Sequence, residues 1–206
     1  MIDRETGIVW THLDGIANRG PLQGERLAML PLIHMTWEQW RRGHPDTLVL
    51  SPDTPFQSRY RSISIGMFNP REATFGDDRL AGNALVVGVE VKGEFRGYPT
   101  EELEKVGGVV NDTLAGQPIV VIYDAEARTG IAYLRTVNDQ TLEFHNPSYP
   151  EFELWNQETG STWDRQGRAV SGALTGASLE FVPSFISEWY GWSGYHPETT
   201  LFQADQ

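Results

Sequence analysis

The chain has 206 residues, a hydrophobic fraction of 39%, no cysteine and a formal net charge of −12. Its length suits one large domain, or two small ones packed closely together, with a core that needs no disulfide. The missing cysteines exclude thiolate catalysis, iron–sulfur clusters and cysteine-ligated zinc. The negative charge argues against nucleic acid as a partner, and no apolar run approaches the roughly 20 residues of a membrane span.

The first elements in chain order are a short N-terminal strand and a short helix. We expect the strand, within residues 5–10, to pair back onto the main sheet. Residues 24–31 (GERLAMLP) indicate a second short strand that ends at a proline. Residues 36–45 (TWEQWRRGHP) predict one or two helical turns with Thr36 as the N-cap, because a threonine oxygen there can accept a free backbone N–H.

The middle of the chain begins with a polar, proline-containing stretch. Residues 51–82 predict a long surface excursion. Residues 83–99 (NALVVGVEVKGEFRGYP) then predict a β-hairpin that turns at Lys92–Gly93. Residues 100–107 (TEELEKVG) predict a short helix capped by Thr100.

Two further β elements follow. Residues 117–124 (QPIVVIYD) form a β-branched run between turn residues, which is typical of a central strand. Residues 129–147 predict a second hairpin, which turns at Asn138–Asp139.

The last part of the chain repeats the first. Residues 158–202 align with residues 5–50, and residues 176–183 and 187–197 predict a strand and a helix like those of the first stretch, with Ser187 as the helix N-cap. Glycine, proline and tryptophan dominate the matches, which chance seldom preserves at fixed spacing. The matched pairs include Glu5/Glu158, Trp10/Trp163, Gly20/Gly172, Gly24/Gly176, Pro31/Pro183, Trp37/Trp189, Trp40/Trp192, His44/His196 and Thr47/Thr199.

These elements together predict a β-rich α+β fold. We expect mixed or antiparallel sheets, a few short helices and an internal duplicated β/turn/helix unit at about 5–50 and 158–202. The two copies flank a central β-rich segment, 83–147. The whole chain, 1–206, is predicted to be a single compact pseudo-symmetric domain.

The same phrases carry a family resemblance. The chain resembles, over about residues 3–202, the prokaryotic family catalogued as domain of unknown function 3179, on the strength of DRETGIVW, GPLQGERLAMLP, TWEQW, HPDTLVL, GEFRGYP, VVNDTLAGQPIVV and TGSTWDRQGRAVSGALTG. Members carry the unit in tandem and are often exported, so the resemblance implies an extracytoplasmic origin. It also implies that this chain begins inside one unit and continues through a whole one. No signal peptide is recognisable in the chain.

One departure from the family pattern limits the chemistry. Many members have a Cys-Pro-x-Cys-like element after the strand that here reads PIVVIY, whereas this chain has residues 124–127 (DAEA) there. Any redox or metal role of those thiols is therefore absent here. The family brings no established activity with it.

Candidate site residues come from the unrepeated middle and from one repeated tryptophan. Asp112, Asp124 and His145 are the candidate catalytic residues, because carboxylates and a histidine can exchange protons near neutral pH. Each also has a structural reading: a turn cap, a solvated loop carboxylate or a ring that bonds a backbone carbonyl. The candidate ligand-binding residues are Asn111, Arg128 and Trp163.

The residues support two functions of different classes. The first is a non-catalytic binding or structural module whose partner is a small molecule or a protein, with association into an oligomer left open. The second is a hydrolase- or lyase-type enzyme that uses Asp/His acid–base chemistry, with or without a divalent cation. No cofactor and no defined metal site are predicted, because the duplicated pair His44 and His196 is better explained as two copies of one structural turn.

Overall fold

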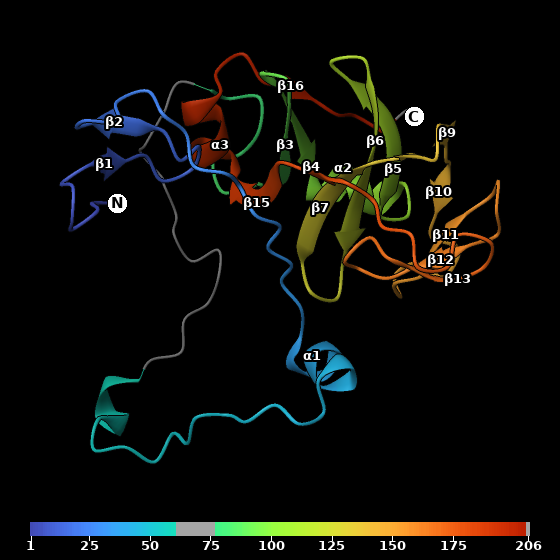
Figure 1. Ribbon diagram of the computed structural model, residues 1–206, viewed down its shortest axis with the longest axis horizontal. Helices are drawn as coiled ribbons and strands as arrows, with labels where there is room; N and C mark the ends of the chain where they lie inside the picture. Colours follow the sequence, from blue (N-terminus) through green and yellow to red (C-terminus); the bar gives the residue numbers. More distant parts are fainter. Residues whose placement is uncertain (61–76, 205–206) are drawn as a thin grey trace.

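The computed structural model describes residues 1–60 and 77–204 of the 206-residue chain. Within them the chain is β-rich, with mostly antiparallel sheets and three short α-helices, which confirms the predicted β-rich α+β class. Most strands gather in one body, a hairpin of β1 and β2 lies at one side, and a segment that carries α1 leaves the body (Figure 1). The predicted surface excursion over 51–82 includes residues 61–76, which lie outside the described residues.

Two four-stranded sheets form the centre of the body. The first has the order β15-β3-β4-β16, and its strands pair antiparallel except β16, which is parallel to β4. The predicted turn at Lys92–Gly93 is confirmed, because these residues have φ of 50° and 82°, as a type I′ hairpin turn requires. The strands are β3 (Leu85–Val91), β4 (Glu94–Pro99), β15 (Ser184–Glu188) and β16 (Thr200–Leu201).

The second sheet has the order β14-β7-β6-β5, so β6 is the central strand that the sequence predicts. Helix α2 (Thr100–Lys105) leads from the first sheet into it. The helix itself is confirmed, but Thr100 is its first residue and not its cap: Pro99 stands at the N-cap and makes no side-chain hydrogen bond. The strands are β5 (Val109–Leu114), β6 (Gln117–Asp124), β7 (Thr129–Leu134) and β14 (Phe181–Val182).

The third sheet covers the outer face of the second. Its order is β10-β11-β12-β13, all antiparallel. The predicted turn at Asn138–Asp139 is confirmed by φ of 50° and 61°, and it joins a small hairpin of β8 and β9. The strands of this small hairpin are β8 (Thr136–Val137) and β9 (Gln140–Thr141). The strands of the third sheet are β10 (Phe144–His145), β11 (Leu154–Asn156), β12 (Thr162–Trp163) and β13 (Ala169–Ser171).

Strand β6 is buried on both faces because apolar layers lie on either side of it. Successive side chains of a strand point to opposite faces. Ile119 and Val121 therefore pack in the core beneath β3 and β4, while Val120 and Ile122 pack in the core beneath the third sheet. Helix α3 (Trp189–Tyr195) covers the other side of β3. The body consequently has four layers: α3, then three sheets.

The N-terminal strand does not join these sheets. β1 (Val9–Trp10) pairs with β2 (Ala17–Arg19) in a separate two-stranded sheet, and Val9 also bridges Ile2. The expectation that it would pair onto the main sheet is therefore wrong. Instead, a bidentate ion pair attaches Arg26, which bridges Ile16 next to β2, to Glu90 of β3. The Arg26 guanidinium donates to both carboxylate oxygens of Glu90, at 2.6 and 2.5 Å.

Residues 29–49, which we call the arm, carry α1 (Trp37–Gly43) away from the body (Figure 1). The predicted cap is confirmed: Thr36 accepts from the Gln39 amide, and the Gln39 side chain accepts from the Thr36 amide. The predicted strand over 24–31 is wrong, since only Arg26 makes an isolated bridge there. A strand needs a neighbour along its length, and in the part of the chain that the structure describes this stretch has one only where residues 24–27 bond to residues 15–17.

The stretches 5–50 and 158–202 share local conformations but not surroundings. Gly20 and Gly172 both have positive φ, and an added Cβ would clash with Ile8 in the first case and with Ser161 in the second. In each stretch the second helical tryptophan donates its indole N–H to a threonine hydroxyl seven residues later, at 2.8 and 2.9 Å. Trp163 is buried, whereas Trp10 is only half-buried. That the two form halves of one pseudo-symmetric domain stays a prediction.

One detail of the second helix differs from expectation. Ser187 is not the N-cap of α3, because β15 continues through Glu188, which takes that position without a side-chain hydrogen bond. The Ser187 hydroxyl donates instead to the Glu188 carbonyl at 3.1 Å. The strand continues because each of its residues finds a partner on β3.

Candidate functional site

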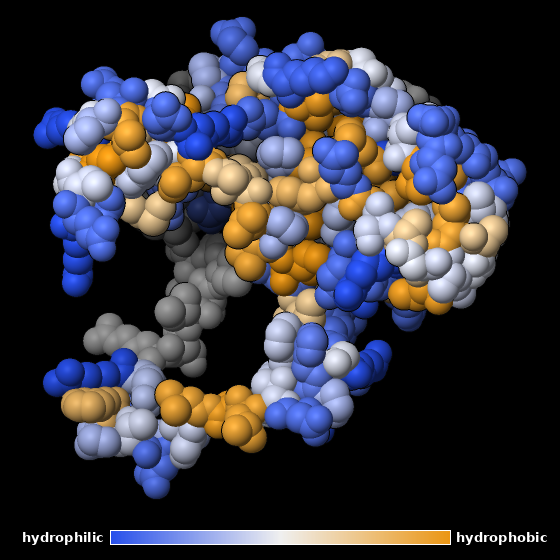
Figure 2. Space-filling model, viewed as in Figure 1, coloured by the Kyte–Doolittle hydropathy of each residue, from blue (hydrophilic) through white to orange (hydrophobic). Residues whose placement is uncertain are grey.

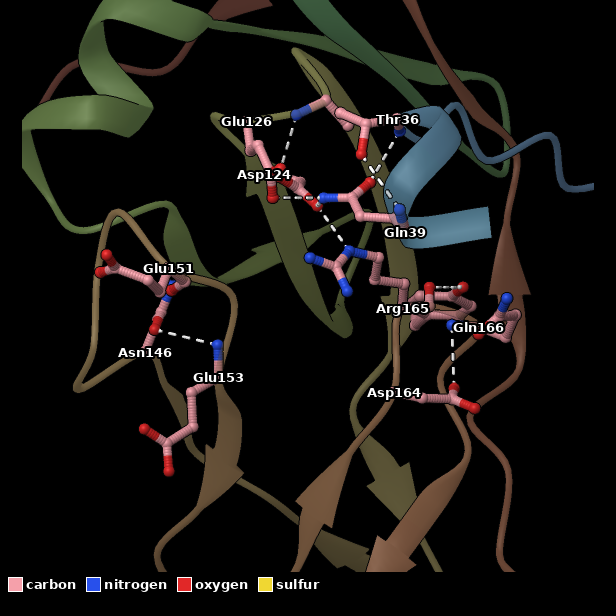
Figure 3. A network of polar contacts seen from close by, with 12 residues as sticks. Thr36, Gln39, Asp124, Glu126, Asn146, Glu151, Glu153, Asp164, Arg165 and Gln166 are labelled. Carbon is pink, nitrogen blue, oxygen red and sulfur yellow. Dashed lines mark hydrogen bonds and ion pairs between the residues drawn. The ribbon is translucent and has the colours of Figure 1, made fainter. Parts of the chain in front are cut away.

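A buried carboxylate at the end of β6 is the centre of a polar cluster. Asp124 is only 4% exposed, and its oxygens accept hydrogen bonds from three groups (Figure 3). The Arg165 Nε lies 2.5 Å from Oδ2, the Gln39 Nε2 lies 3.3 Å from the same oxygen, and the Ala127 amide lies 3.1 Å from Oδ1. A buried carboxylate is tolerated only with such partners, so these contacts hold Asp124 as a structural anion.

Gln39 joins the arm to this cluster. Its Nε2 also donates to the Glu126 carboxylate at 2.7 Å, while its Oε1 completes the capping box of α1 (Figure 3). One side chain therefore closes the helix start and attaches the helix to the turn between β6 and β7. Ile33 adds an apolar contact with the core beneath the third sheet.

Arg165 connects the third sheet to the second. Its guanidinium lies over the Phe152 ring, 4.3 Å from the centroid, and pairs with Asp124. Its backbone carbonyl accepts from the Tyr133 hydroxyl at 3.0 Å, and burial raises the pKa of Tyr133 well above its ordinary value. Arg165 and Phe152, together with Gln39 and His44 from the arm, also line a groove of about 310 Å³.

A second groove runs along the other side of the arm. It has a volume of about 550 Å³ and a mostly apolar lining that includes Met35, Leu85 and Ile186. Arg128, a predicted ligand-binding residue, lines it together with Glu126. Arg165, and not Arg128, is the arginine that pairs with Asp124.

Asp112 lies in a different place from Asp124. It stands opposite Ile119 in the pairing of β5 with β6, five residues from Asp124 along β6, which is roughly 16 Å at about 3.3 Å per residue. Its Oδ2 accepts from the Arg96 guanidinium at 2.6 Å and from the Tyr98 hydroxyl at 2.7 Å. Burial raises the pKa of Asp112, but these hydrogen bonds outweigh it and hold the pKa below its ordinary value.

Asn111 faces the opposite side of β5, toward the third sheet. Its Nδ2 donates to the Phe144 carbonyl at 2.8 Å and its Oδ1 accepts from the Phe144 amide at 2.9 Å. The neighbouring His145 lies beside the Trp155 ring, and its buried Nε2 has no hydrogen-bond partner among the described residues. Trp163 is buried and donates its indole N–H to Asn156 at 3.0 Å.

The structure therefore does not bring the predicted site residues together. Asn111 bonds to Phe144, the residue before His145, whereas Asp112 lies on the other face of β5 and Asp124 lies at the far end of β6. The sequence reading missed Arg165 and Gln39 as partners of Asp124. The Thr-x-x-Gln capping pattern that begins at Thr36 signals the local role of Gln39, but no pattern signals its contact with β6.

Exposed apolar side chains gather along the arm. Trp37 and Trp40 are 50% and 37% exposed, although their counterparts Trp189 and Trp192 are 0% and 1% exposed. Figure 2 shows apolar groups on the segment that leaves the body and on the face of the body that it approaches. The other large exposed apolar residues of the arm are Leu30, Leu32, Leu48 and Val49.

Two arrangements are absent from the part of the chain that the structure describes. Residues 1–60 and 77–204 contain no group of three or more His, Cys, Asp or Glu side chains that could hold a metal ion. No helix in these ranges combines the length and the apolar character needed to cross a membrane.

Comparison with known proteins identifies a family. The model of the family described as "Protein of unknown function (DUF3179)" matches residues 1–199, which confirms the resemblance found in the sequence. No curated protein and no solved structure matches the chain.

Proposed function

The chain belongs to the DUF3179 family, and we propose that it is a non-catalytic binding or structural module whose partner is a protein. The observation that carries the proposal is the exposure of Trp37 and Trp40 on a helix whose start is fixed to the body through Gln39. Exposed tryptophans are typical of the centres of protein interfaces, because their burial on binding removes a large apolar area from water.

The state of the two candidate carboxylate bases, Asp112 and Asp124, supports a non-catalytic function. A general base needs an oxygen or nitrogen that is free to accept a proton from a substrate. The carboxylate oxygens of Asp124 and Asp112 instead accept hydrogen bonds within the fold, in each case from an arginine and from further donors. Both carboxylates act as structural anions in this reading.

The arm supports a protein partner over a small molecule. Its exposed apolar residues extend from Leu30 to Val49, which is far longer than a small ligand could cover. Contiguous exposed apolar surface on a soluble protein marks an interaction site. The extracytoplasmic origin that the family resemblance implies belongs to the same proposal, and fractionation of the producing cells with an antibody tests it.

Cross-linking through the arm tests the proposal. Because the chain has no cysteine, Leu48→Cys introduces one thiol, at a position that is 94% exposed, for a photoreactive benzophenone label. Irradiation in an extract of the producing cells is expected to give a discrete protein adduct, which should disappear when Trp37 and Trp40 are changed to alanine. Val170→Cys, on an exposed part of β13, is the matched control and should give no such adduct. Equal labelling from both positions would contradict the proposal.

A hydrolase- or lyase-type enzyme is the second candidate. The observation that favours it is that Arg165 lines the 310 Å³ groove beside the arm. Arg165 is the ion-pair partner of Asp124. Asp124 would have to leave Arg165 to act as a base there, and Asp112 and His145 lie too far away to assist it. Turnover of a generic ester or glycoside that Asp124→Asn abolishes, while the variant stays folded, would favour the enzyme.

A further inference from the structure

Residues 181–201, which we call the closing segment, complete both central sheets. β14 pairs with β7, β15 pairs with β3, and β16 pairs with β4. Between β15 and β16, helix α3 places two buried tryptophans on the outer face of β3. The edges and the face of β7, β3 and β4 that this segment covers form one continuous surface, which we call the acceptor surface.

The contact of α3 with the acceptor surface depends on small residues. Trp192 lies over Gly88 of β3, where an added Cβ would come within 2.2 Å of the indole ring. Trp189 and Trp192 both approach Gly97 of β4, at 3.5 Å from the position of a Cβ. His196 stacks on Phe95 at 3.9 Å between ring centroids.

The arm shares the tryptophan, histidine, proline and threonine positions of the closing segment at the same spacing. Trp37, Trp40, His44 and Thr47 stand where the closing segment has Trp189, Trp192, His196 and Thr199. The His44 and His196 amides both donate to the carbonyl four residues earlier at 2.9 Å, and each histidine ring lies against the tryptophan of that residue, at 4.1 and 4.4 Å.

The likeness continues to the N-terminus. Ile2 forms an antiparallel bridge with Val9, and at the corresponding positions of the second stretch Trp155 of β11 pairs with Thr162 of β12. Residues 1–4 therefore take the place of β11 in the first stretch. The first stretch therefore has counterparts of β11, β12, β13 and α3. It has no counterpart of β3, β4 and β7 among the described residues except those that the closing segment already occupies.

We propose that the arm is a second closing segment, and that its partner is a second two-sheet block of the kind formed by residues 77–153. This inference rests on the proposed function and specifies its partner. The described chain holds two such segments and one acceptor surface, so a further acceptor must come from a block that has no closing segment of its own. Such a block offers open strand edges for β-addition and a glycine-bearing face for the two tryptophans.

The pairing that follows is specific. Leu32–Thr36 would add antiparallel to the strand that corresponds to β3, as β15 does. Leu48 and Val49 would add parallel to the strand that corresponds to β4, as β16 does. Trp40 would lie over the glycine that corresponds to Gly88. The arm's exposed aliphatic residues would then be the ones that become buried.

A fusion protein tests this geometry. A copy of residues 77–153 is placed directly before Met1 of the full chain, since Met1 corresponds to Leu154. N-bromosuccinimide reactivity of the tryptophans is then measured with and without the fused block, and a Trp37→Ala/Trp40→Ala background identifies their signals. We expect Trp37 and Trp40 to react in the parent and to lose their reactivity in the fusion. Reactivity at the parent rate, or a fused block that stays unfolded, would overturn the proposal.

A second variant tests the arm without the added block. Replacing residues 181–201 by the sequence of residues 29–49 keeps the length, and the chimera is expected to unfold in one cooperative transition that alanines at both helical tryptophans abolish. A chimera that does not fold counts against the proposal, and so does tryptophan reactivity in the fusion that stays at the parent rate. If the tryptophans stay reactive in the fusion while the Leu48→Cys adduct still forms, the second block is rejected and the proposed protein binding stands.

Discussion

Trp192 covers Gly88 so closely that β3 has no room for any side chain at this position: a Cβ there would lie 2.2 Å from the indole ring. The indole N–H is held by the Thr199 hydroxyl at 2.9 Å, which limits how far the ring can move away. The glycine and the tryptophan thus depend on one another, although about a hundred residues separate them.

Gly88→Ala is expected to lower the free energy of unfolding. The added methyl group overpacks the site, which typically costs about 1–3 kcal/mol. Urea denaturation followed by tryptophan fluorescence measures the change. Gly43→Ala in α1 is the control, since a Cβ there meets nothing within 4 Å. An equal loss in both variants would contradict the close contact.

The equivalent tryptophans of the two helices should differ in their contribution to stability. Trp192→Ala removes a buried side chain and should cost about 3–5 kcal/mol. Trp40→Ala removes a side chain that is 37% exposed and should cost about 1 kcal/mol or less. Thermal unfolding of both variants measures the difference, and similar melting temperatures would show that the arm is as well buried as α3.

Arg165→Met should destabilise the protein by about 3 kcal/mol, because removing one partner of a buried pair leaves the other charge unpaired. The double variant Asp124→Asn/Arg165→Met should lose less than the sum of the two single variants, and a double-mutant cycle in urea measures this coupling. Arg168→Met is the matched control: its pair with Asp164 is exposed, so the expected cost is about 0–1 kcal/mol. Additive single-variant effects would contradict a direct pair.

Asp112 should make stability depend on pH in the acid range. Its pKa is lowered in the folded state, where burial is outweighed by hydrogen bonds from Tyr98 and Arg96. The stabilisation is therefore present above the unfolded-state pKa and is lost as the pH falls through the folded-state pKa. Asp112→Asn should destabilise the protein more at pH 7 than at pH 3, as denaturant titrations at the two values would show. The same effect from Asp46→Asn, at an exposed site, would contradict the assignment.

Local signals in the sequence predict local structure here. The turn pairs Lys92–Gly93 and Asn138–Asp139 signal the two hairpin turns because glycine, asparagine and aspartate take positive φ readily. The β-branched run of β6 predicts a central strand because both of its faces must be buried. Thr36 with Gln39 predicts the start of α1 because both hydrogen bonds of the capping box are local.

The errors and omissions come from partners distant in the chain. Residues 24–31 have the composition of a strand, but among the described residues only 24–27 find a backbone partner, whereas the similar stretch 176–183 reaches β7 through Phe181 and Val182. Asp124 binds Arg165, 41 residues away, and no pattern along the chain specifies which of several arginines will lie there. The candidate site could therefore be predicted as residue types but not as an arrangement.

The contact of Asn111 with Phe144 has a consequence for how the outer layer is positioned. The hydrophobic effect between two sheets is non-directional, so it specifies their offset less strictly than a hydrogen bond does. The Asn111 amide reproduces the paired donor and acceptor of a neighbouring backbone, and it can do so opposite Phe144 but not two residues away. The Asn111 side chain therefore fixes the offset between the second and third sheets. It thereby also fixes the position of the residues of the third sheet and its loops, Arg165 included.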